Sequence, residues 1–219
     1  MPAIATTDHG YIYGAYEFWS KARKYNIKPI IGVEAYITPG TARGDKTRVK
    51  WGDGGRDDIG GNGAYTHMTL LSRTTEGMHN LFRMSSLASL EGHYYKPRMD
   101  RELLQTYGSG LIATTGCPSG EVQTRLRLGQ YDAARAAAAE FQDIFGKENY
   151  FAEIMDHGLS IERRVMTDLL RLAKDLDIPL VATNDSHYTH QHEADAHRSE
   201  EHTSELQSRS TISYAVFCL

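Results

Sequence analysis

The sequence predicts an α/β fold in which alternating strands and helices build a parallel sheet or a βα barrel. Two observations support this prediction. Apolar runs of strand length alternate with amphipathic runs of helix length along the chain. The 219 residues, 40% of them hydrophobic and 24% charged, are also enough for one globular domain with a buried core.

The first part of the chain predicts three strands and one helix. Residues 2–10 predict a strand that begins almost at the first residue, and the amphipathic stretch 13–25 predicts a helix. The apolar run 28–37 predicts a buried strand. Residues 40–63 are rich in Gly, Asp, Arg and Lys without any period, which predicts a mobile insertion. A third strand is expected at 64–73.

The remainder alternates more regularly. We expect helices at 74–90 and 100–108, a strand at 110–117, a helix at 130–146, a strand at 149–158, a helix at 160–177 and a last strand at 178–188. Candidate N-caps are Thr74 or Thr75 for the first of these helices and Ser160 for the last. Gly108 and Gly146 are expected to end helices.

Bulk properties limit the functional classes. The net charge of -4 provides no overall basic field, so charge alone does not predict nucleic-acid binding. Two cysteines, Cys117 and Cys218, do not make a disulfide framework, which indicates a reducing compartment. No apolar run approaches the roughly 20 residues that span a bilayer, and no secretory signal is visible. We therefore expect a cytoplasmic protein without a membrane partner.

Candidate metal ligands recur where the predicted strands end. The carboxyl ends of parallel strands meet at one edge of a sheet, where active sites form, so these side chains are expected to converge. Imidazole, thiol and carboxylate groups are the usual ligands of zinc, manganese and iron. The candidates are Asp8, His9, Glu34, His67, Cys117, Asp156, His157, Asp185 and His187.

Spacing refines this hypothesis. Asp185 and His187 are two residues apart on a predicted strand, so both side chains should leave one face and could bind one ion or bridge two. Asp8 and His9 are adjacent, so one is expected to be a ligand and the other to orient a neighbour. Glu34 lies in an apolar strand, where a carboxylate is costly unless it is paired or coordinating. Each residue alone has an ordinary structural interpretation, but their conjunction favours a metal centre.

Several segments resemble one known family. They are "TDHGYIYGAYEFWSKARKYNIKPIIGVEAYITPG", "HMTLLSRTTEGMHNLFRMSSLASLEGHYYKPRMD", "GLIATTGCPSGEV", "YFAEIMDHG" and "VATNDSHY". These are similar to the PHP (polymerase and histidinol phosphatase) domain at the start of the bacterial DNA polymerase III α subunit. The "YYKPR" run is particular to polymerase α subunits, and the insertion and the ligand types look most like an actinobacterial member. The resemblance covers residues 1 to about 197.

The resemblance implies a distorted barrel of seven βα units around up to three divalent ions, Zn or Mn. Carried over residue by residue, it implies supporting polar groups at Asp8 and His157. In members that keep the ligands, it implies metal-dependent phosphodiester hydrolysis of the 3′–5′ exonuclease type. DNA and other replisome subunits would be the partners, in DNA replication by a DNA-directed DNA polymerase. The ligands here would be His9, Glu34, His67, Cys117, Asp185 and His187.

The sequence also departs from the family pattern. The family's first strand, with its His-x-His pair, and an upstream aspartate ligand have no counterpart, and neither do the polymerase palm and fingers. We therefore expect a partial PHP domain at 1–197, an incomplete (β/α)7 barrel without its first strand, cut from a longer protein. Such a piece should lack polymerase activity, hold at most one or two ions weakly and be inactive as a nuclease.

Two alternatives stay open. One is a free-standing PHP phosphoesterase that acts on a small ester such as histidinol phosphate, which the "YYKPRMD" run and the 40–63 insertion disfavour. The other is a non-catalytic scaffold for the polymerase, which the six retained ligand types disfavour.

The end of the chain differs in character from the rest. "RSEEHTSELQS" and "ISYAVFCL" match translations of the two ends of a common short-read sequencing adapter, and the residues between them fit an index in frame. We therefore expect residues 198–219 to be non-native and disordered, which removes His202 and Cys218 from the search for ligands.

Overall fold

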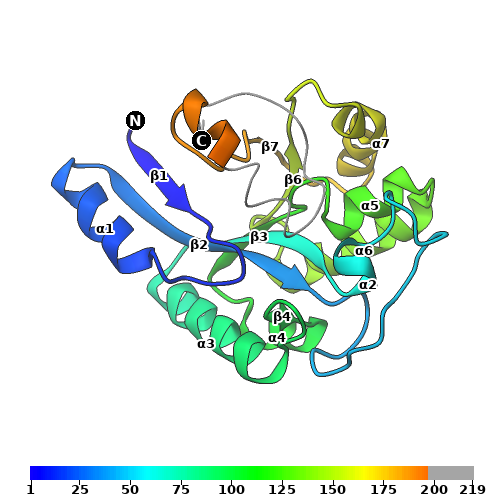
Figure 1. Cartoon of the computed structure of the whole chain (residues 1–219), viewed down its shortest axis with the longest axis horizontal. Coiled ribbons are helices and arrows are strands. Elements are labelled where there is room, and N and C mark those ends of the chain that lie inside the picture. The colour runs from blue at the N-terminus through cyan, green and yellow to red at the C-terminus, as the bar shows by residue number, and fades with distance from the viewer. Residues whose placement is uncertain (197–219) are drawn as a thin grey trace.

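A computed structural model describes residues 1–196, so the predicted non-native tail at 198–219 lies outside the described residues. Figure 1 shows a mixed sheet curled into an open half-barrel, with α1, α3 and α4 packed along one part of it and α5, α6 and α7 along another. This arrangement confirms the predicted α/β class and the incomplete barrel. No helix within residues 1–196 is long and apolar enough to cross a bilayer.

Seven strands and seven helices make up the described chain. The strands are β1 (Ala3–Thr6), β2 (Lys28–Ile37), β3 (Thr66–Ser72), β4 (Arg98–Met99), β5 (Leu111–Thr114), β6 (Tyr150–Ile154) and β7 (Leu180–Ala182). The helices are α1 (Ala15–Lys24), α2 (Gly60–Gly63), α3 (Thr75–Glu91), α4 (Arg101–Tyr107), α5 (Glu121–Arg127), α6 (Tyr131–Phe145) and α7 (Ser160–Asp175), followed by a 3₁₀ turn at Gln191–Glu193.

The sheet is not fully parallel, so the prediction of a parallel sheet was wrong at one strand. The strand order is β1-β2-β3-β5-β6-β7, with β4 paired to β2, and β3 runs antiparallel to both β2 and β5. A parallel pair needs a crossover connection that packs on the sheet. The 40–63 connection between β2 and β3 contains only the short α2, so it supplies no such crossover.

Several boundaries also differ from the prediction. The last strand ends at Ala182 and not at residue 188, and β4 and α5 were missed because they are too short to show a period. Thr74 is the N-cap of α3, and its side chain accepts a hydrogen bond from the Gly77 amide at 3.0 Å, as predicted. Ser160 was predicted to be the N-cap of α7, and this was wrong by one residue. Ser160 is the first residue of the helix, and Leu159 is the N-cap.

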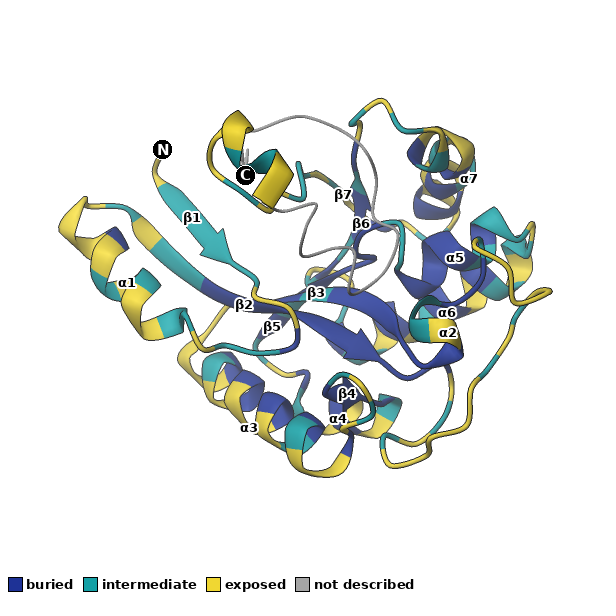
Figure 2. Cartoon of the chain, viewed as in Figure 1, coloured by how far each residue is buried: buried dark blue, intermediate teal, exposed yellow. Residues whose placement is uncertain are grey.

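The core lies between the sheet and the helices that cover it (Figure 2). Strand residues such as Val33 and Leu70 are fully buried against helix residues such as Leu81 and Leu172. Helix α6 contributes a row of small buried side chains, Ala134, Ala137 and Ala138, which lets its backbone approach the sheet closely.

Buried Arg98 in β4 connects the 40–63 segment to the rest of the fold. Its guanidinium donates hydrogen bonds to the carbonyl oxygens of Arg43 at 2.8 Å, Asp45 at 2.9 Å and Gly92 at 3.0 Å. Farther along the same segment, the Asp58 carboxylate accepts hydrogen bonds from four backbone amides, those of Trp51, Gly52, Gly54 and Ile59. Mobility of this segment stays a prediction. The segment could move only if these hydrogen bonds broke.

Arg98→Met should therefore destabilise the protein and loosen the 40–63 segment. The substitution removes the guanidinium that donates to the partly buried carbonyl oxygens of Arg43 and Asp45 and to that of Gly92, and we expect a loss of about 3 kcal/mol in the free energy of unfolding. Urea unfolding gives the stability, and limited proteolysis followed by mass spectrometry shows whether new cuts fall within residues 40–63. Exposed Arg135→Met is the matched control. Equal midpoints for the two variants would contradict this account of the segment.

Candidate metal centre

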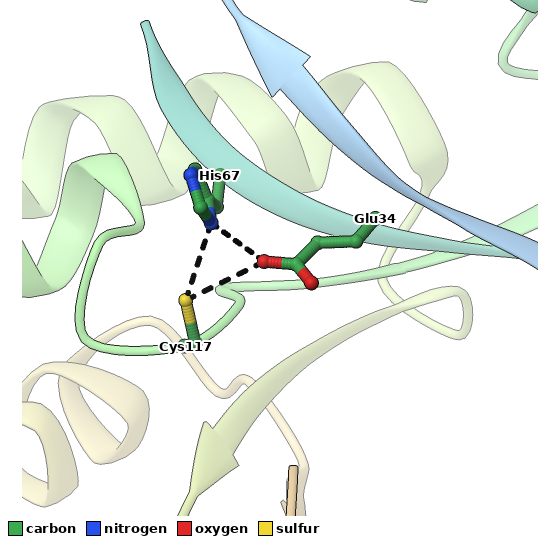
Figure 3. A group of neighbouring side chains, drawn as sticks. All are labelled: Glu34, His67 and Cys117. Atoms are coloured by element: carbon green, nitrogen blue, oxygen red, sulfur yellow. Dashed lines mark hydrogen bonds and ion pairs between the residues drawn. The ribbon is translucent and has the colours of Figure 1, made fainter. Parts of the chain in front are cut away.

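Three buried side chains of different chemistry converge in the half-barrel (Figure 3). His67 Nδ1 lies 2.5 Å from Glu34 Oε1. Cys117 Sγ lies 3.7 Å from the same carboxylate oxygen and 3.6 Å from His67 Nδ1. All three residues are at least nine-tenths buried. An imidazole, a carboxylate and a thiol therefore present one ligand atom each to a common point.

Strand register brings Glu34 and His67 together. Tyr36 of β2 pairs directly with His67 of β3, and Glu34 is two residues before Tyr36, so Glu34 and His67 are diagonal neighbours on one face. Because β3 is antiparallel, its first residues lie beside the last residues of β2. His67 therefore joins the predicted cluster, although it lies at the start of its strand and not at the end.

Cys117 reaches the same point from the loop after β5. The His67 amide donates to the Ser119 carbonyl at 3.1 Å, which fixes this loop against the start of β3. Gly116 has a φ of 78°, and a Cβ there would lie 3.1 Å from the His67 carbonyl oxygen. Glycine at this position allows the loop to pass close to β3 and to turn the thiol inward.

The other predicted ligands adjoin the triad. His9 Nδ1 lies 2.9 Å from Glu34 Oε2, so the two oxygens of Glu34 contact different imidazoles. The His9 ring stacks on His187 with centroids 5.4 Å apart, and His187 Nε2 lies 3.5 Å from Asp185 Oδ1. All six predicted ligands thus form one continuous cluster.

The strand geometry predicted for Asp185 and His187 was wrong, although the two side chains do contact each other. Strand β7 ends at Ala182, so strand alternation does not place them. Asp185 instead adopts a left-handed conformation with φ of 44°, which aspartate tolerates better than most residues.

Comparison with known proteins shows the family of this chain. Residues 1–157 match the PHP domain. This chain belongs to the PHP domain family. It is 56% identical over 206 residues to the DNA polymerase III subunit alpha of Saccharopolyspora erythraea, and 54% identical over 202 residues to that of Mycobacterium tuberculosis. The alignment with the Thermus aquaticus protein of the same name is 41% identical over 211 residues.

The first two relatives are actinobacterial, as the predicted resemblance implied. These alignments cover 90%, 89% and 96% of this chain but only 17%, 17% and 16% of the three relatives. The chain therefore spans about a sixth of the length of the proteins it matches.

The donor set of the PHP centre fits a transition-metal ion. Sulfur, imidazole nitrogen and carboxylate oxygen within 4.8 Å of one another are typical of zinc sites, whereas a thiol is a poor ligand for magnesium or calcium. Burial and the negative charges of Glu34 and Asp185 raise the pKa of the Cys117 thiol. Burial also raises the pKa of Glu34, but the imidazoles of His67 and His9 outweigh it and hold that pKa below its ordinary value. A bound cation would favour the thiolate.

Sequence reasoning missed one buried acid of this PHP domain, Glu153 in β6. Its carboxylate accepts hydrogen bonds from the hydroxyls of Thr114 and Thr183. Burial raises the pKa of Glu153 to about 7, although the threonine hydroxyls lower it, and the charges of Asp185 and Glu34 raise it further. The signal was present in the sequence, because Glu153 interrupts an apolar strand just as Glu34 does.

The two residues predicted as supporting groups have distinct contacts. Asp8 accepts a hydrogen bond from the Gly14 amide at 3.1 Å and so braces the turn that leads into α1. His157 Nδ1 lies 2.5 Å from Glu162 Oε1, and its Nε2 lies 2.7 Å from the carbonyl oxygen of Asn184. Asn184 directly precedes Asp185, so His157 connects α7 to the loop that bears two predicted ligands.

His157 is expected to be an imidazolium in this arrangement. A carboxylate and a carbonyl oxygen only accept hydrogen bonds, so both ring nitrogens must carry protons. Burial lowers the pKa of His157, but the bonds to Glu162 and Asn184 outweigh it and the pKa is raised above its ordinary value.

Stability should depend on pH through His157. A histidine with a raised folded-state pKa stabilises fully below its unfolded pKa of about 6.5, and the contribution is lost as the pH rises through the folded value. The difference in unfolding free energy between wild type and His157→Gln should therefore shrink as the pH rises above about 6.5. Urea midpoints measured over a pH series in EDTA test this. Exposed His79→Gln is the control, and a pH-independent His157→Gln difference would contradict the assignment.

Proposed function

We propose that this chain is the PHP portion of a bacterial DNA polymerase III α subunit and that its centre hydrolyses phosphodiester bonds in DNA, as a 3′–5′ exonuclease does. The observation that supports this most is the continuous cluster from Cys117 through Glu34 to His187. In this proposal the polymerase activity belongs to the longer protein, which works in the cytoplasm with DNA and other replisome subunits.

The arrangement of the ligands suits an open catalytic site. Cys117, His67 and Glu34 are buried at its base, whereas the His9 side chain is 44% exposed and the side chains of Asp185 and His187 are partly exposed. Glu34 faces His67 and Cys117 with one oxygen and His9 with the other, so it could bridge two ions. Zinc or manganese ions held by the six residues would activate water and neutralise charge on a phosphoryl group.

The protein itself contributes the positions of these groups. Strand register sets Glu34 against His67, and the His157 bridge orients the loop with Asp185 and His187. Because His9 and His187 are the partly exposed imidazoles of the cluster, a phosphodiester in this proposal approaches the ions from their side.

Asp185→Asn should abolish exonuclease activity in the polymerase-length protein that contains this domain. Loss of one metal ligand should lower the rate of 3′ nucleotide removal from single-stranded DNA by at least about a hundredfold, because even residues that only orient ligands are worth 10- to 100-fold. The assay uses labelled DNA with Mn²⁺ or Zn²⁺. Asp156→Asn is the control, because Asp156 is exposed and its carboxylate accepts a hydrogen bond from the Gly158 amide at 3.1 Å.

The same assay separates the alternatives. Unchanged DNA hydrolysis in Asp185→Asn, or none in the wild type, would refute the proposed function and favour a scaffold. Hydrolysis of a small phosphomonoester but not of DNA would favour a phosphatase.

A further inference from the structure

A second polar site lies beside the metal centre. The 49–63 segment, the loop after β5, α5 and α7 enclose a cavity of about 220 Å³. Three cationic side chains, Lys50, Arg56 and Arg127, line it together with Ser119. Asp58 is the one carboxylate among its lining residues.

The cations of this cavity have no carboxylate partner among the described residues, because the nearby acids are engaged elsewhere. Asp57 pairs with Arg164 at 2.8 Å. The carboxylate of Asp58 already accepts the four amide hydrogen bonds described above. The cavity therefore has an excess of positive charge.

Arg127 forms the wall that the cavity shares with the metal centre. Its guanidinium donates to the carbonyl oxygens of Pro118 and Asp57 and to the Thr124 hydroxyl, none of which neutralises its charge. Pro118 directly follows Cys117, and the next residue, Ser119, accepts the amide hydrogen bond of His67. One short loop thus separates the positive cavity from the thiol and imidazole of the triad.

We propose that this cavity is a phosphate subsite for a DNA strand whose neighbouring phosphodiester lies at the metal centre. This inference rests on the proposed function, because that function supplies the strand. Guanidinium and ammonium groups that have no carboxylate partner recognise phosphate oxygens well. A positively charged groove that follows the backbone is also the common way to hold a single strand without reading its bases.

The test measures binding without hydrolysis. The full chain in EDTA is titrated against a fluorescently labelled oligothymidylate at several salt concentrations, and polarisation gives the affinity. In the Lys50→Gln/Arg56→Gln variant, affinity should fall on the order of tenfold at about 0.1 M salt, and the plot of log affinity against log salt should become shallower by about 1.4, about 0.7 for each lost phosphate contact. The Lys24→Gln/Lys46→Gln variant removes the same charge from exposed positions outside the cavity and should keep the wild-type slope.

Two results would overturn the inference. The first is an affinity and salt slope in Lys50→Gln/Arg56→Gln equal to those of the control. The second is displacement of the oligonucleotide by inorganic phosphate at the same concentration of phosphate groups, which would assign the cavity to a free anion. Failure of the exonuclease test with the binding result intact would refute the proposed function alone, so the two failures are distinguishable.

Discussion

The buried carboxylate of Glu34 is the constraint around which this PHP domain is arranged. It lies on β2, the only described strand that pairs with three others, and it is almost inaccessible to water. A carboxylate in such a place is unfavourable unless positive or hydrogen-donating groups surround it. His67, His9 and Cys117 supply them from three other parts of the chain, so the fold and the site depend on the same contacts.

The antiparallel strand β3 makes this arrangement possible. It brings the beginning of one strand to the ends of its two neighbours, so that His67 comes close to Glu34 and to the loop that bears Cys117. The 40–63 connection that permits this direction is itself held to the fold by Arg98 and forms one wall of the positively charged cavity. A segment without periodic structure thus contributes both to the topology and to the lining of this cavity.

The sequence predicted the class of fold, and which side chains come together, better than it predicted their geometry. Apolar runs and capping residues such as Thr74 are local signals, and they identified most helices and strands correctly. The direction of β3 and the two-residue strand β4 depend on pairing between distant segments, which no local pattern encodes. Glu153 was missed although it interrupts an apolar strand as Glu34 does, because Asp156 and His157 at the end of the same predicted strand supplied the candidate ligands there. The partners of His157 became visible only when α7 was placed beside the loop after β7.

Cobalt binding tests the central claim, that Glu34, His67 and Cys117 form one metal site. Co²⁺ is added to chelator-treated full-length chain, and the near-ultraviolet absorption reports bonding between sulfur and cobalt. We predict a sulfur-to-cobalt charge-transfer band in the wild type that disappears in Cys117→Ser and persists in Cys218→Ser, the variant at the only other cysteine. A wild type without the band, or a band that survives in Cys117→Ser, would contradict the account.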